Sequence, residues 1–585
     1  MVKYGLSSIA VFIMFNISYC NPPFLASDKW AEETLQSLTL KEKIGQLFMI
    51  AAASSFKQPD ELLASAMQKS PYKMDEEYIT KMIQEYNIGG IIFLFKSEPE
   101  KQIYFTKKYQ SLSKIPLLIG LDAEWGLSMR LEKVVRYPRN MTLGAIQDEQ
   151  LIYQMGYEVG QQCKAIGVHI NFAPVADVNN NPKNPVIHDR SFGDDPKCVA
   201  QLAKLYSQGL QDAGVIACAK HFPGHGDTDT DSHFDLPVIK HNRTRLNNIE
   251  LYPFKELVSS GVGAIMNAHL SVPELDPTPN LPSSLSYSIV TQELKKNLGF
   301  NGLVITDGLG MQAITKYYKP GELELKAFLA GNDILLCPLD VPLAIEKIET
   351  AIKSGLVIEE ELNKRVLKIL KAKAWVLNKQ EKIDPDFLTR EAYSLQKILY
   401  ESAITLVKKS SDLNFGAELL NNSLIIQVGS LPENKLANNK KIFPIPVTLS
   451  EARSAKSNGY SMYLSTDCCK IKYCKSDMSD QELLDCLEQA QYKDTIIISV
   501  GQMNKFMAQK FGIASNTLSL ITELKKINKK IIVIIFGTPY SLNYFNEADT
   551  IIVAYEDAVP MQKAAVKVLT GDLKATGKLP VNVKF

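Results

Sequence analysis

The segment from Lys220 to His233, KHFPGHGDTDTDSH, concentrates side chains that can move protons or bind a metal ion. It holds three of the seven histidines in the chain, together with three aspartates. His221 and His225 have the spacing of two zinc ligands on one helix, but Pro223 and Gly224 lie between them and disfavour a helix. Neither H-E-x-x-H nor the nucleophile elbow G-x-S-x-G occurs in the sequence. We therefore expect no metal ion, no organic cofactor and no serine nucleophile.

Asp231 and His233 are two residues apart in this irregular stretch, so the carboxylate can accept the Nδ1 proton of the imidazole. That contact would orient the ring and raise its pKa, which makes a general acid near neutral pH. Asp307 in VITDGLGM is a candidate for the opposite side of a scissile bond, because glycines beside it allow close approach of a substrate. A carboxylate placed there can attack the anomeric carbon of a sugar. A solvated acidic loop is the alternative interpretation of the histidine segment.

The elements that would position these residues form a regular alternation of apolar runs and amphipathic stretches. Eight apolar runs lie at residues 46–51, 88–95, 116–122, 168–177, 214–221, 262–269, 302–307 and 332–337. Helical patterns such as DEQLIYQMGYEVGQQCKAIG separate several of them. Buried strands that alternate with helices indicate a parallel sheet, and eight such units suit a (β/α)8 barrel of the TIM type. We place this domain at residues 28–378.

Polar residues gather at the carboxyl ends of these runs. They are Asp122, Asp177, Lys220, His221, His269 and Asp307. In a barrel those strand ends converge on one face, where active sites are built, whereas a doubly wound sheet would place its chemistry at one switch point. The distribution therefore favours the barrel. We interpret Asp177 and His269 as supporting residues.

A second, smaller domain follows a linker at residues 379–398. Its apolar runs are AITLVKK, SLIIQVG, SMYLST, DTIIISVG, KIIVIIFGTP and ADTIIVAYE. Helical patterns such as NTLSLITELKKIN lie between the later runs, which predicts an α/β/α sandwich over residues 399–585. Acids and histidines do not gather at the ends of these runs, so a structural role is favoured over a second active site.

The first twenty residues differ from the rest of the chain. Lys3 precedes an apolar run that is short for a bilayer span, and polar residues follow from Asn21. This pattern predicts a signal peptide at residues 1–20 and an exported protein, periplasmic or associated with the cell envelope. A buried first helix is the alternative. The ending ISYC leaves a lipid anchor on Cys20 open, although Tyr19 is larger than the residue such signals prefer.

The positions of the cysteines leave their pairing open. Four of the nine cysteines cluster near the C-terminus: Cys468, Cys469, Cys474 and Cys486. They contain no C-x-x-C pair, so a zinc or thioredoxin-like site is disfavoured. In an exported protein this cluster can hold one disulfide, and the sequence leaves its partners open.

Charge and composition narrow the classes of partner. The 65 basic and 64 acidic residues leave a net charge of +1, so no bulk field attracts nucleic acid or an anionic membrane. Apolar residues make up 45% of the chain and charged residues 22%, which is usual for a globular protein. We expect no nucleic-acid partner.

The motifs, taken in order, resemble those of family 3 glycoside hydrolases, in the two-domain form of the β-N-acetylhexosaminidase branch. The similarity covers the whole barrel, and KHFPGHG followed by DSH is its most specific block. The motifs that carry it are LTLKEKIGQLFMIA, IGGIIFLF, GLDAEWGLSMRL, YPRNMTLGA, NFAPVADVNNNP, DRSFGDDP, KHFPGHGDTDTDSH, GLVITDGLGM and AGNDILL. The ending GKLPV is similar to the C-terminal sandwich of two-domain members.

The resemblance implies a role for each matching position. Asp307 would be the nucleophile of a retaining double displacement, and His233, paired with Asp231, would be the acid/base. Five residues match positions that hold the hydroxyls and the acetamido group of the terminal sugar: Asp122, Arg130, Arg190, Lys220 and His221. Carboxylates accept hydrogen bonds from hydroxyls, and Arg and Lys donate them to oxygens, which suits such a site. Glu124 is a further candidate contact.

The implied activity is a β-N-acetylglucosaminidase that acts on peptidoglycan fragments (muropeptides) or chitin-like oligosaccharides. A phosphorylase or β-glucosidase on the same fold and a non-catalytic glycan-binding protein are the alternatives. Two positions depart from the family pattern. Trp125 stands where relatives often have Gly, and Gly308 stands where many have a second Asp after the nucleophile. Both departures could alter the choice of substrate.

Overall fold

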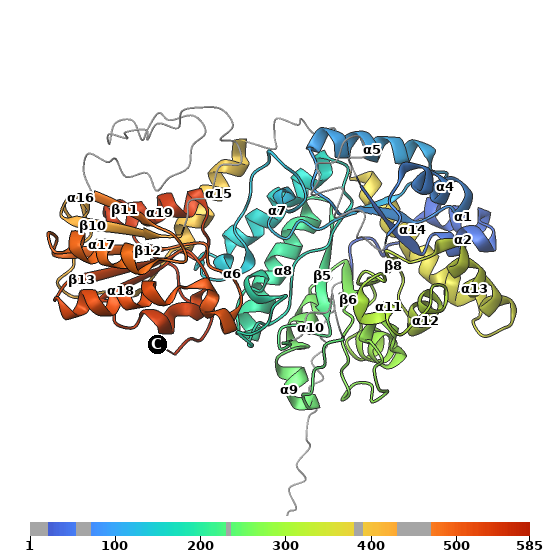
Figure 1. The fold of residues 1–585 in the computed structure, drawn as a ribbon. Helices are drawn as coiled ribbons and strands as arrows, with labels where there is room; N and C mark the ends of the chain where they lie inside the picture. Colours follow the sequence, from blue (N-terminus) through green and yellow to red (C-terminus); the bar gives the residue numbers. More distant parts are fainter. Residues whose placement is uncertain (1–20, 54–71, 230–235, 380–389, 430–469, 585) are drawn as a thin grey trace, which may run out of the picture.

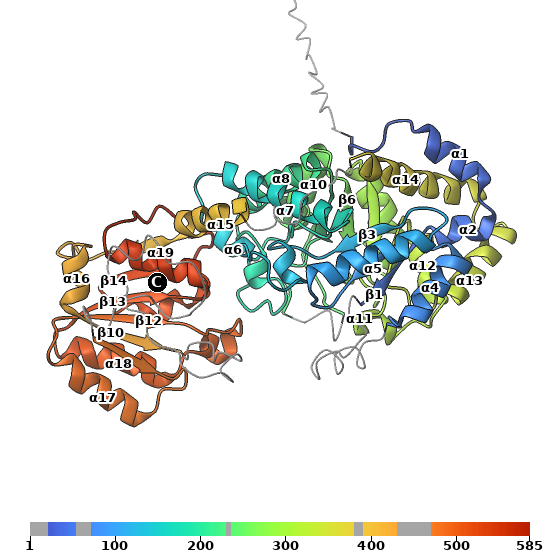
Figure 2. The same ribbon diagram turned by 90° about the horizontal axis from the view of Figure 1, so that it is seen from above.

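The computed structural model describes residues 21–53, 72–229, 236–379, 390–429 and 470–584. Two lobes are joined side by side, a larger one from the first two-thirds of the chain and a smaller one from the last third (Figures 1 and 2). The predicted signal peptide, the Cys20 anchor, the SMYLST run, Cys468 and Cys469 lie outside the described residues.

The larger lobe is a parallel eight-stranded sheet with neighbours in the order β7-β6-β5-β4-β3-β2-β1-β8. Its strands are β1 Phe48–Ala52, β2 Gly90–Phe93, β3 Leu118–Leu121, β4 Ile170–Asn171, β5 Ile216–Phe222, β6 Ala264–Asn267, β7 Leu303–Thr306 and β8 Leu335–Leu336. A parallel bridge between Ile305 on β7 and Ile334, the residue before β8, joins the two outermost strands of this order and closes the sheet into a barrel. All eight predicted runs contain a strand.

The barrel strands are buried along their whole length, which explains their continuous apolar sequences. Helices surround them: α1 Lys29–Ser37, α2 Leu40–Gly45, α4 Glu76–Tyr86, α5 Pro99–Leu112, α7 Gln150–Ala165, α8 Pro196–Asp212, α10 Tyr252–Ser259, α12 Glu322–Ala330, α13 Val341–Lys353 and α14 Glu359–Asn378. Local sequence defines their starts. The Asp195 side chain accepts hydrogen bonds from two backbone N–H groups at the start of α8, and Thr39 forms a capping box with Glu42 at α2.

Further helices lie in the connections between the strands and these outer helices. They are η1 Leu127–Met129, α6 Asn140–Leu143, η2 His188–Arg190, α9 Arg243–Asn248, η3 Ser283–Leu285, the π-helical η4 Ser288–Asn297 and α11 Gln312–Thr315. Several follow the carboxyl end of a strand, where (β/α)8 barrels vary their loops to build sites.

The smaller lobe is a six-stranded sheet with the order β11-β10-β12-β13-β14-β9, in which only β9 is antiparallel to its neighbour. Its strands are β9 Thr405–Lys408, β10 Ser423–Val428, β11 Lys470–Cys474, β12 Thr495–Val500, β13 Lys530–Ile535 and β14 Thr550–Val553. Helices α17 Asp480–Ala490 and α18 Ser515–Lys526 cover one face, and α15 Arg390–Ala403, α16 Ala417–Asn421 and α19 Val559–Leu569 cover the other (Figure 1). The predicted barrel followed by a smaller α/β/α sandwich is confirmed.

Two features of this lobe differ from the sequence analysis. Strand β11 (KIKYC) was not predicted, because its alternation of lysines with Ile471 and Tyr473 covers only four residues and lacks the long apolar run that marks the other strands. Helix α15 begins at Arg390, so residues 390–398 of the predicted linker are helical. The helix packs on α19 and also contacts α6 and α7 of the barrel, and this tertiary contact accounts for its position.

Glu556 forms a polar link between the two lobes. Its carboxylate accepts hydrogen bonds from the Arg139 backbone N–H at 2.7 Å and from Thr142 Oγ1 at 2.8 Å. Arg136 Nη2 forms an ion pair with the same side chain at 2.9 Å. Because Glu556 is only 8% exposed, these donors compensate a carboxylate that is largely removed from water. The sandwich is therefore docked on the barrel at a defined position.

The described residues also settle two smaller points. None of their helices combines the length and apolarity needed to cross a membrane. Cys474 on β11 and Cys486 on α17 are both buried thiols, and their Sγ atoms lie 3.3 Å apart. The structure thus brings together two of the four clustered cysteines.

Candidate active site

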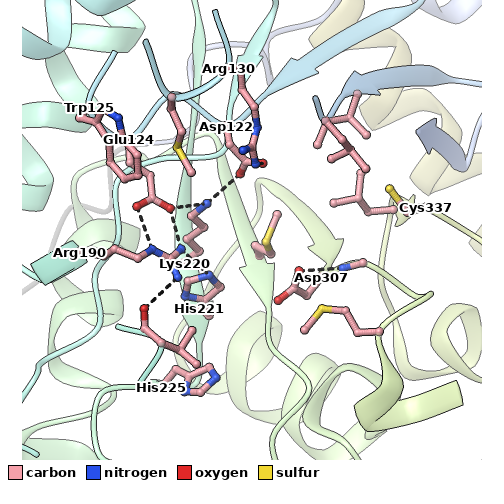
Figure 3. A pocket seen from close by; sticks show the side chains of 18 of the residues that line it. Asp122, Glu124, Trp125, Arg130, Arg190, Lys220, His221, His225, Asp307 and Cys337 are labelled. Atoms are coloured by element: carbon pink, nitrogen blue, oxygen red, sulfur yellow. Dashed lines mark hydrogen bonds and ion pairs between the residues drawn. The ribbon is translucent and has the colours of Figure 1, made fainter. Parts of the chain in front are cut away.

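A cavity of about 460 Å³ opens at the carboxyl ends of the barrel strands. Asp122 follows β3, Lys220 and His221 end β5, and Asp307 follows β7, so four predicted residues meet there through the barrel geometry (Figure 3). Arg130 and Arg190, the other predicted binding residues, reach the same cavity from η1 and η2. Its volume lies within the range typical of small-molecule sites.

Asp122 is held between two cations. Lys220 Nζ lies 2.9 Å from Asp122 Oδ1, and Arg130 Nη2 lies 2.7 Å from Oδ2. Burial by itself would raise the pKa of Asp122, but the charges of Lys220 and Arg130 outweigh burial and hold this pKa well below its usual range. The carboxylate is therefore ionised and oriented, and it can accept hydrogen bonds from hydroxyl groups of a ligand.

Glu124 forms a second charged group beside the first. Its carboxylate takes a bidentate contact from Arg190, with Nη2 at 2.6 Å and Nε at 3.0 Å, and Lys220 Nζ lies 3.0 Å away. Burial opposes ionisation, yet the charges of Arg190 and Lys220 lower the pKa of Glu124. The same two carboxylates, Asp122 and Glu124, raise the pKa of the buried Lys220 against the effect of burial. Sequence analysis treated Glu124 only as a further candidate contact, and its place two residues after Asp122 was the available signal.

His221 is oriented by Asp177. The ring Nδ1 lies 2.7 Å from Asp177 Oδ2, and the backbone N–H groups of His221 and His225 donate to Asp177 Oδ1 at 3.1 and 2.7 Å. Asp177 is fully buried, so these donors stabilise its negative charge. Its contacts agree with the interpretation of Asp177 as a supporting residue. On its other side, His221 Nε2 lies 3.5 Å from Arg190 Nη2. His225 also lines the cavity, and burial lowers its pKa to about 4, so its ring is neutral near pH 7.

Asp307 lines the cavity on the side away from Glu124 and Arg190 in Figure 3. Its Oδ1 accepts a hydrogen bond of 2.7 Å from the Gly308 N–H. His269 Nε2 contacts the Gly308 carbonyl at 3.0 Å, and its Nδ1 contacts Ser284 Oγ at 2.7 Å. Burial would raise the pKa of Asp307, but the nearby His269 and His221 and the Gly308 N–H lower it. Asp307 is therefore an ionised carboxylate at the cavity wall, which is the state a nucleophile requires.

Asp231 and His233 fall at residues 230–235 and lie outside the described residues, so their roles stay predictions.

An ion-pair cluster joins the chain on either side of that segment. Asp227 Oδ2 lies 2.8 Å from His241 Nε2 and 3.4 Å from Arg245 Nη2. Arg245 Nη2 also lies 3.0 Å from Glu250 Oε1.

The same cluster has the spacing of a metal site. Potential ligand atoms of Asp227, His241 and Glu250 lie within 4.8 Å of one another. Arg245 already contacts both acids, so a guanidinium supplies the positive charge that these carboxylates need. We therefore interpret the cluster as an ion-pair network, and the predicted absence of a metal stays a prediction.

Both departures from the family pattern border the cavity. The guanidinium of Arg139 lies over the Trp125 ring at 4.6 Å from its centroid, and Arg139 also pairs with Asp189. The indole is thus fixed from one side by a cation. At the second position, a Cβ on Gly308 would lie 2.9 Å from the hydroxyl of Tyr72. Tyr72 therefore occupies the space into which a side chain at position 308 would extend.

Other lining residues were missed by the sequence analysis. Most are apolar: Ile92, Leu94, Met129, Val186, Met266, Met311 and Leu336. In the sequence these residues could not be distinguished from residues of the hydrophobic core, because apolar residues at strand ends occur both in the core and in pocket walls. Lys505 is the lining residue that comes from the sandwich, some 200 positions beyond Asp307 in the chain. Only the docking of the two lobes could reveal it.

The chemistry of this cavity follows from its charges. One wall carries carboxylates and cations that present hydrogen-bonding groups in fixed directions, which suits a ligand rich in hydroxyls. The other carries the ionised Asp307. The family sequence model of the glycosyl hydrolase family 3 N-terminal domain matches residues 39–372 of this chain. The model of the family's C-terminal domain matches residues 311–585. The chain belongs to glycosyl hydrolase family 3.

The similar curated proteins include β-hexosaminidases, one of which aligns over nearly the whole chain. Beta-hexosaminidase A of Pseudoalteromonas piscicida is 28% identical over 93% of the chain and 97% of that relative. Beta-hexosaminidase LpqI of Mycobacterium tuberculosis is 33% identical over 49% of the chain and 76% of that relative. The resemblance to the β-N-acetylhexosaminidase branch is confirmed, and this family 3 protein is a glycosidase.

One solved structure supports the family 3 assignment, and a second shares the fold. A β-N-acetylglucosaminidase from Paenibacillus sp. str. FPU-7 aligns with a TM-score of 0.73 at 30% identity, over 93% of this chain and 99% of that one. The beta-glucoside phosphorylase BglX aligns with a TM-score of 0.75 at 21% identity, over 97% of this chain and 98% of that one. The second likeness shows the fold alone.

Proposed function

We propose that this family 3 glycosidase is a retaining β-N-acetylglucosaminidase that releases terminal, non-reducing N-acetylglucosamine. The observation that carries the proposal is an ionised Asp307 in the same cavity as the Asp122–Lys220–Glu124 charge network. The relatives named β-hexosaminidases and the β-N-acetylglucosaminidase structure support the choice of sugar.

The cavity also supports action at chain ends. Lys220 and Glu124 are almost fully buried, with side chains 3% and 1% exposed, so the charged wall lies at the bottom of a pocket. A pocket that is closed at one end accepts the last sugar of an oligosaccharide and leaves the rest of the chain at its mouth. We propose peptidoglycan fragments or chitin-like oligosaccharides as the substrates.

The proposed reaction takes two steps. An Asp307 carboxylate oxygen attacks the anomeric carbon, the bond to the glycosidic oxygen breaks, and His233 gives its proton to that oxygen. His233 then takes a proton from water as the water oxygen attacks the same carbon and releases Asp307. Asp231 would orient and charge the imidazole. Two displacements at one carbon retain its configuration.

We further propose that the protein is exported and acts in the periplasm or at the cell envelope. The pattern of Lys3 followed by a short apolar run supports a signal peptide at residues 1–20. N-terminal sequencing of the protein from its native cell tests this: we expect a mature chain that starts near Cys20. A chain that begins at Met1 in the cytosol would overturn export.

A phosphorylase is the second candidate. A neutral imidazole as acid/base repels phosphate less than a carboxylate would, so phosphate could replace water as the acceptor. The test is a digest of purified cell-wall fragments and chitin oligosaccharides with and without inorganic phosphate, read by mass spectrometry. We expect free N-acetylglucosamine under both conditions. A phosphate-dependent sugar 1-phosphate would favour the phosphorylase, and no turnover of chromogenic or natural glycosides would favour a non-catalytic glycan-binding protein.

A further inference from the structure

Trp125 forms part of the cavity wall on the side away from the proposed nucleophile. The residue follows Glu124 directly in the chain, and both line the cavity together with Arg190. Figure 3 shows Trp125 next to Glu124, with Asp307 on the opposite side of the lining side chains. An indole is a large and flat group, so at this place it limits how far the cavity extends away from Asp307.

The indole is held from behind by Arg139. The guanidinium of Arg139 lies 4.6 Å from the centroid of the ring, and Arg139 lies outside the set of described residues that line the cavity. An ion pair with Asp189 holds this guanidinium, and the Arg139 backbone N–H donates to Glu556 of the sandwich at 2.7 Å. Because a fixed cation occupies the space behind the ring, Trp125 cannot turn away from the cavity on that side.

The backbone at Trp125 is fixed as well. The Tyr137 N–H donates to the Trp125 carbonyl at 3.3 Å. Gly126 has a φ of +80°, and a Cβ at that position would lie 2.7 Å from the ring of the fully buried Tyr137. This close approach sets the direction in which the neighbouring indole leaves the chain. Since a tryptophan side chain has few rotatable bonds, a fixed backbone and a fixed cation make it a rigid part of the wall.

The wall faces a defined end of the sugar, because the proposed reaction fixes the other end. The anomeric carbon, C1, must lie beside Asp307 for the attack to occur. C4 is across the pyranose ring from C1, so the oxygen on C4 points away from Asp307 and toward the wall that contains Trp125. In chitin-like chains the next sugar on the non-reducing side is attached through this C4 oxygen, whereas a terminal residue carries only a hydroxyl there.

We propose that Trp125 is a specificity-determining residue that excludes N-acetylglucosamine units with a substituent on the C4 oxygen, and so restricts the enzyme to unsubstituted chain ends. The proposal rests on the proposed N-acetylglucosaminidase function and assigns one residue of that same site. Arg139 is a positioning residue, because it acts on the substrate only through the indole. A methyl group forced against a rigid wall should lower kcat/KM by about 10-fold to 100-fold.

The test compares two aryl β-N-acetylglucosaminides that differ in bulk at C4. One carries hydrogen in place of the C4 hydroxyl, and the other carries a methoxy group. Neither substrate can donate a hydrogen bond from C4, so the ratio of their kcat/KM values reports the space at the wall and not the loss of a hydroxyl donor. We expect the wild type to favour the 4-deoxy substrate by about 10-fold to 100-fold, and Trp125→Gly to reduce this ratio about tenfold.

Further variants separate the indole from its support. Trp125→Phe keeps a flat ring against Arg139 and should keep most of the ratio, whereas Trp125→Ala should match Trp125→Gly and replaces it if the glycine variant does not fold. Arg139→Gln should lower the ratio in the wild type but leave it unchanged in Trp125→Gly, because a residue that acts through the indole has no effect without it. Trp30→Ala is the matched control, since Trp30 lies on α1 and is 38% exposed. Circular dichroism checks the folding of each variant.

Each contrary result has its own meaning. If the wild type hydrolyses the two substrates equally well, or if Trp125→Gly leaves their ratio unchanged, Trp125 does not limit the space at C4, while the glycosidase function stands. If Trp125→Gly instead improves hydrolysis of a 6-O-methyl ether, the wall faces C6 and the C4 assignment is wrong. Equal effects of Arg139→Gln in both backgrounds would show that Arg139 does not act through the indole. No hydrolysis of the unmodified aryl glycoside by the wild type would overturn the proposed function itself.

Discussion

His221 Nδ1 lies 2.7 Å from Asp177 Oδ2, and this carboxylate also accepts hydrogen bonds from the backbone N–H groups of His221 and His225. Asp177→Asn keeps an acceptor oxygen but removes the charge. We expect a loss of about 3 kcal/mol in the free energy of unfolding, measured in urea, because the buried donors of His221 and His225 lose the negative charge that they bind. We also expect a lower kcat/KM on a chromogenic N-acetylglucosaminide. An unchanged stability would show that the charge of Asp177 is not needed.

The same contact has a definite pH dependence. Burial would raise the pKa of Asp177, but His221 and the backbone donors lower it below its usual value in the folded state. A lowered folded pKa adds stability that is complete above the unfolded pKa of about 3.9 and is lost as the pH falls through the folded pKa. The difference in stability between wild type and Asp177→Asn should therefore shrink below about pH 4. A difference that stays constant to pH 3 would contradict this assignment.

Asp307→Ala should abolish turnover and leave the fold intact. The substitution removes the proposed nucleophile from the rim of a barrel that is already complete without it, and such losses cost several orders of magnitude in rate. Circular dichroism and thermal unfolding serve as the folding control. A normally folded variant that keeps more than about a tenth of the activity would rule out Asp307 as nucleophile.

His233→Ala should discriminate between leaving groups. An aryl glycoside with an acidic phenol leaves with little help, whereas a sugar hydroxyl needs a proton. We expect the variant to slow disaccharide cleavage far more than aryl glycoside cleavage in the glycosylation step, and Asp231→Ala to do so more mildly. Pre-steady-state bursts must be compared, because His233 also acts as base for water in the second step. Equal losses on both substrates in the burst would make His233 a binding residue.

Gly308 and Tyr72 should behave as a coupled pair. A methyl group at position 308 would meet the Tyr72 hydroxyl at 2.9 Å, and Gly308 N–H holds the Asp307 carboxylate at 2.7 Å. We expect Gly308→Ala to lower kcat about tenfold through this overpacking, and Tyr72→Phe to restore part of the loss in the double variant. Gly416→Ala is the control, because a Cβ at that position meets no atom within 4 Å. Additive effects would show that the two residues are independent.

Cys474 and Cys486 should form a disulfide when the protein meets oxidised glutathione. Their Sγ atoms lie 3.3 Å apart, and the hydrogen bond from Cys486 lowers the pKa of Cys474, which favours the thiolate that attacks a disulfide. The two thiols lose two protons and two electrons, and one glutathione disulfide is reduced to two glutathione molecules. We expect a linked peptide in a non-reducing mass map and a gain of about 2–3 kcal/mol in the free energy of unfolding.

The control for this disulfide is Cys163 on α7, because burial raises the pKa of its thiol to about 12 and it should therefore remain a protonated thiol under the same conditions. Cys486→Ser should remove both the linked peptide and the gain in stability. A Cys474 that stays alkylatable after oxidation of the native protein would contradict the pairing.

The sequence by itself determined the barrel and much of its site. Asp122, Lys220, His221 and Asp307 each end an apolar run, and parallel strands in a closed barrel bring such ends to one face, so their meeting follows from local pattern and chain order. The period of apolar residues also placed the long helices, because an amphipathic segment has one stable way to cover a sheet. The family motifs then added the roles.

Only the tertiary structure decided the remaining relationships. Glu124 became part of the site through its contacts with Arg190 and Lys220, and a side chain at position 308 is excluded by Tyr72, which lies more than 200 residues earlier. Lys505 reaches the cavity because Phe511 packs beside His188 across the domain interface. These are contacts between segments far apart in sequence, and no local periodicity or spacing encodes them. These contacts depend on how the folded surfaces of the two domains fit together. A local run of residues does not predict that fit.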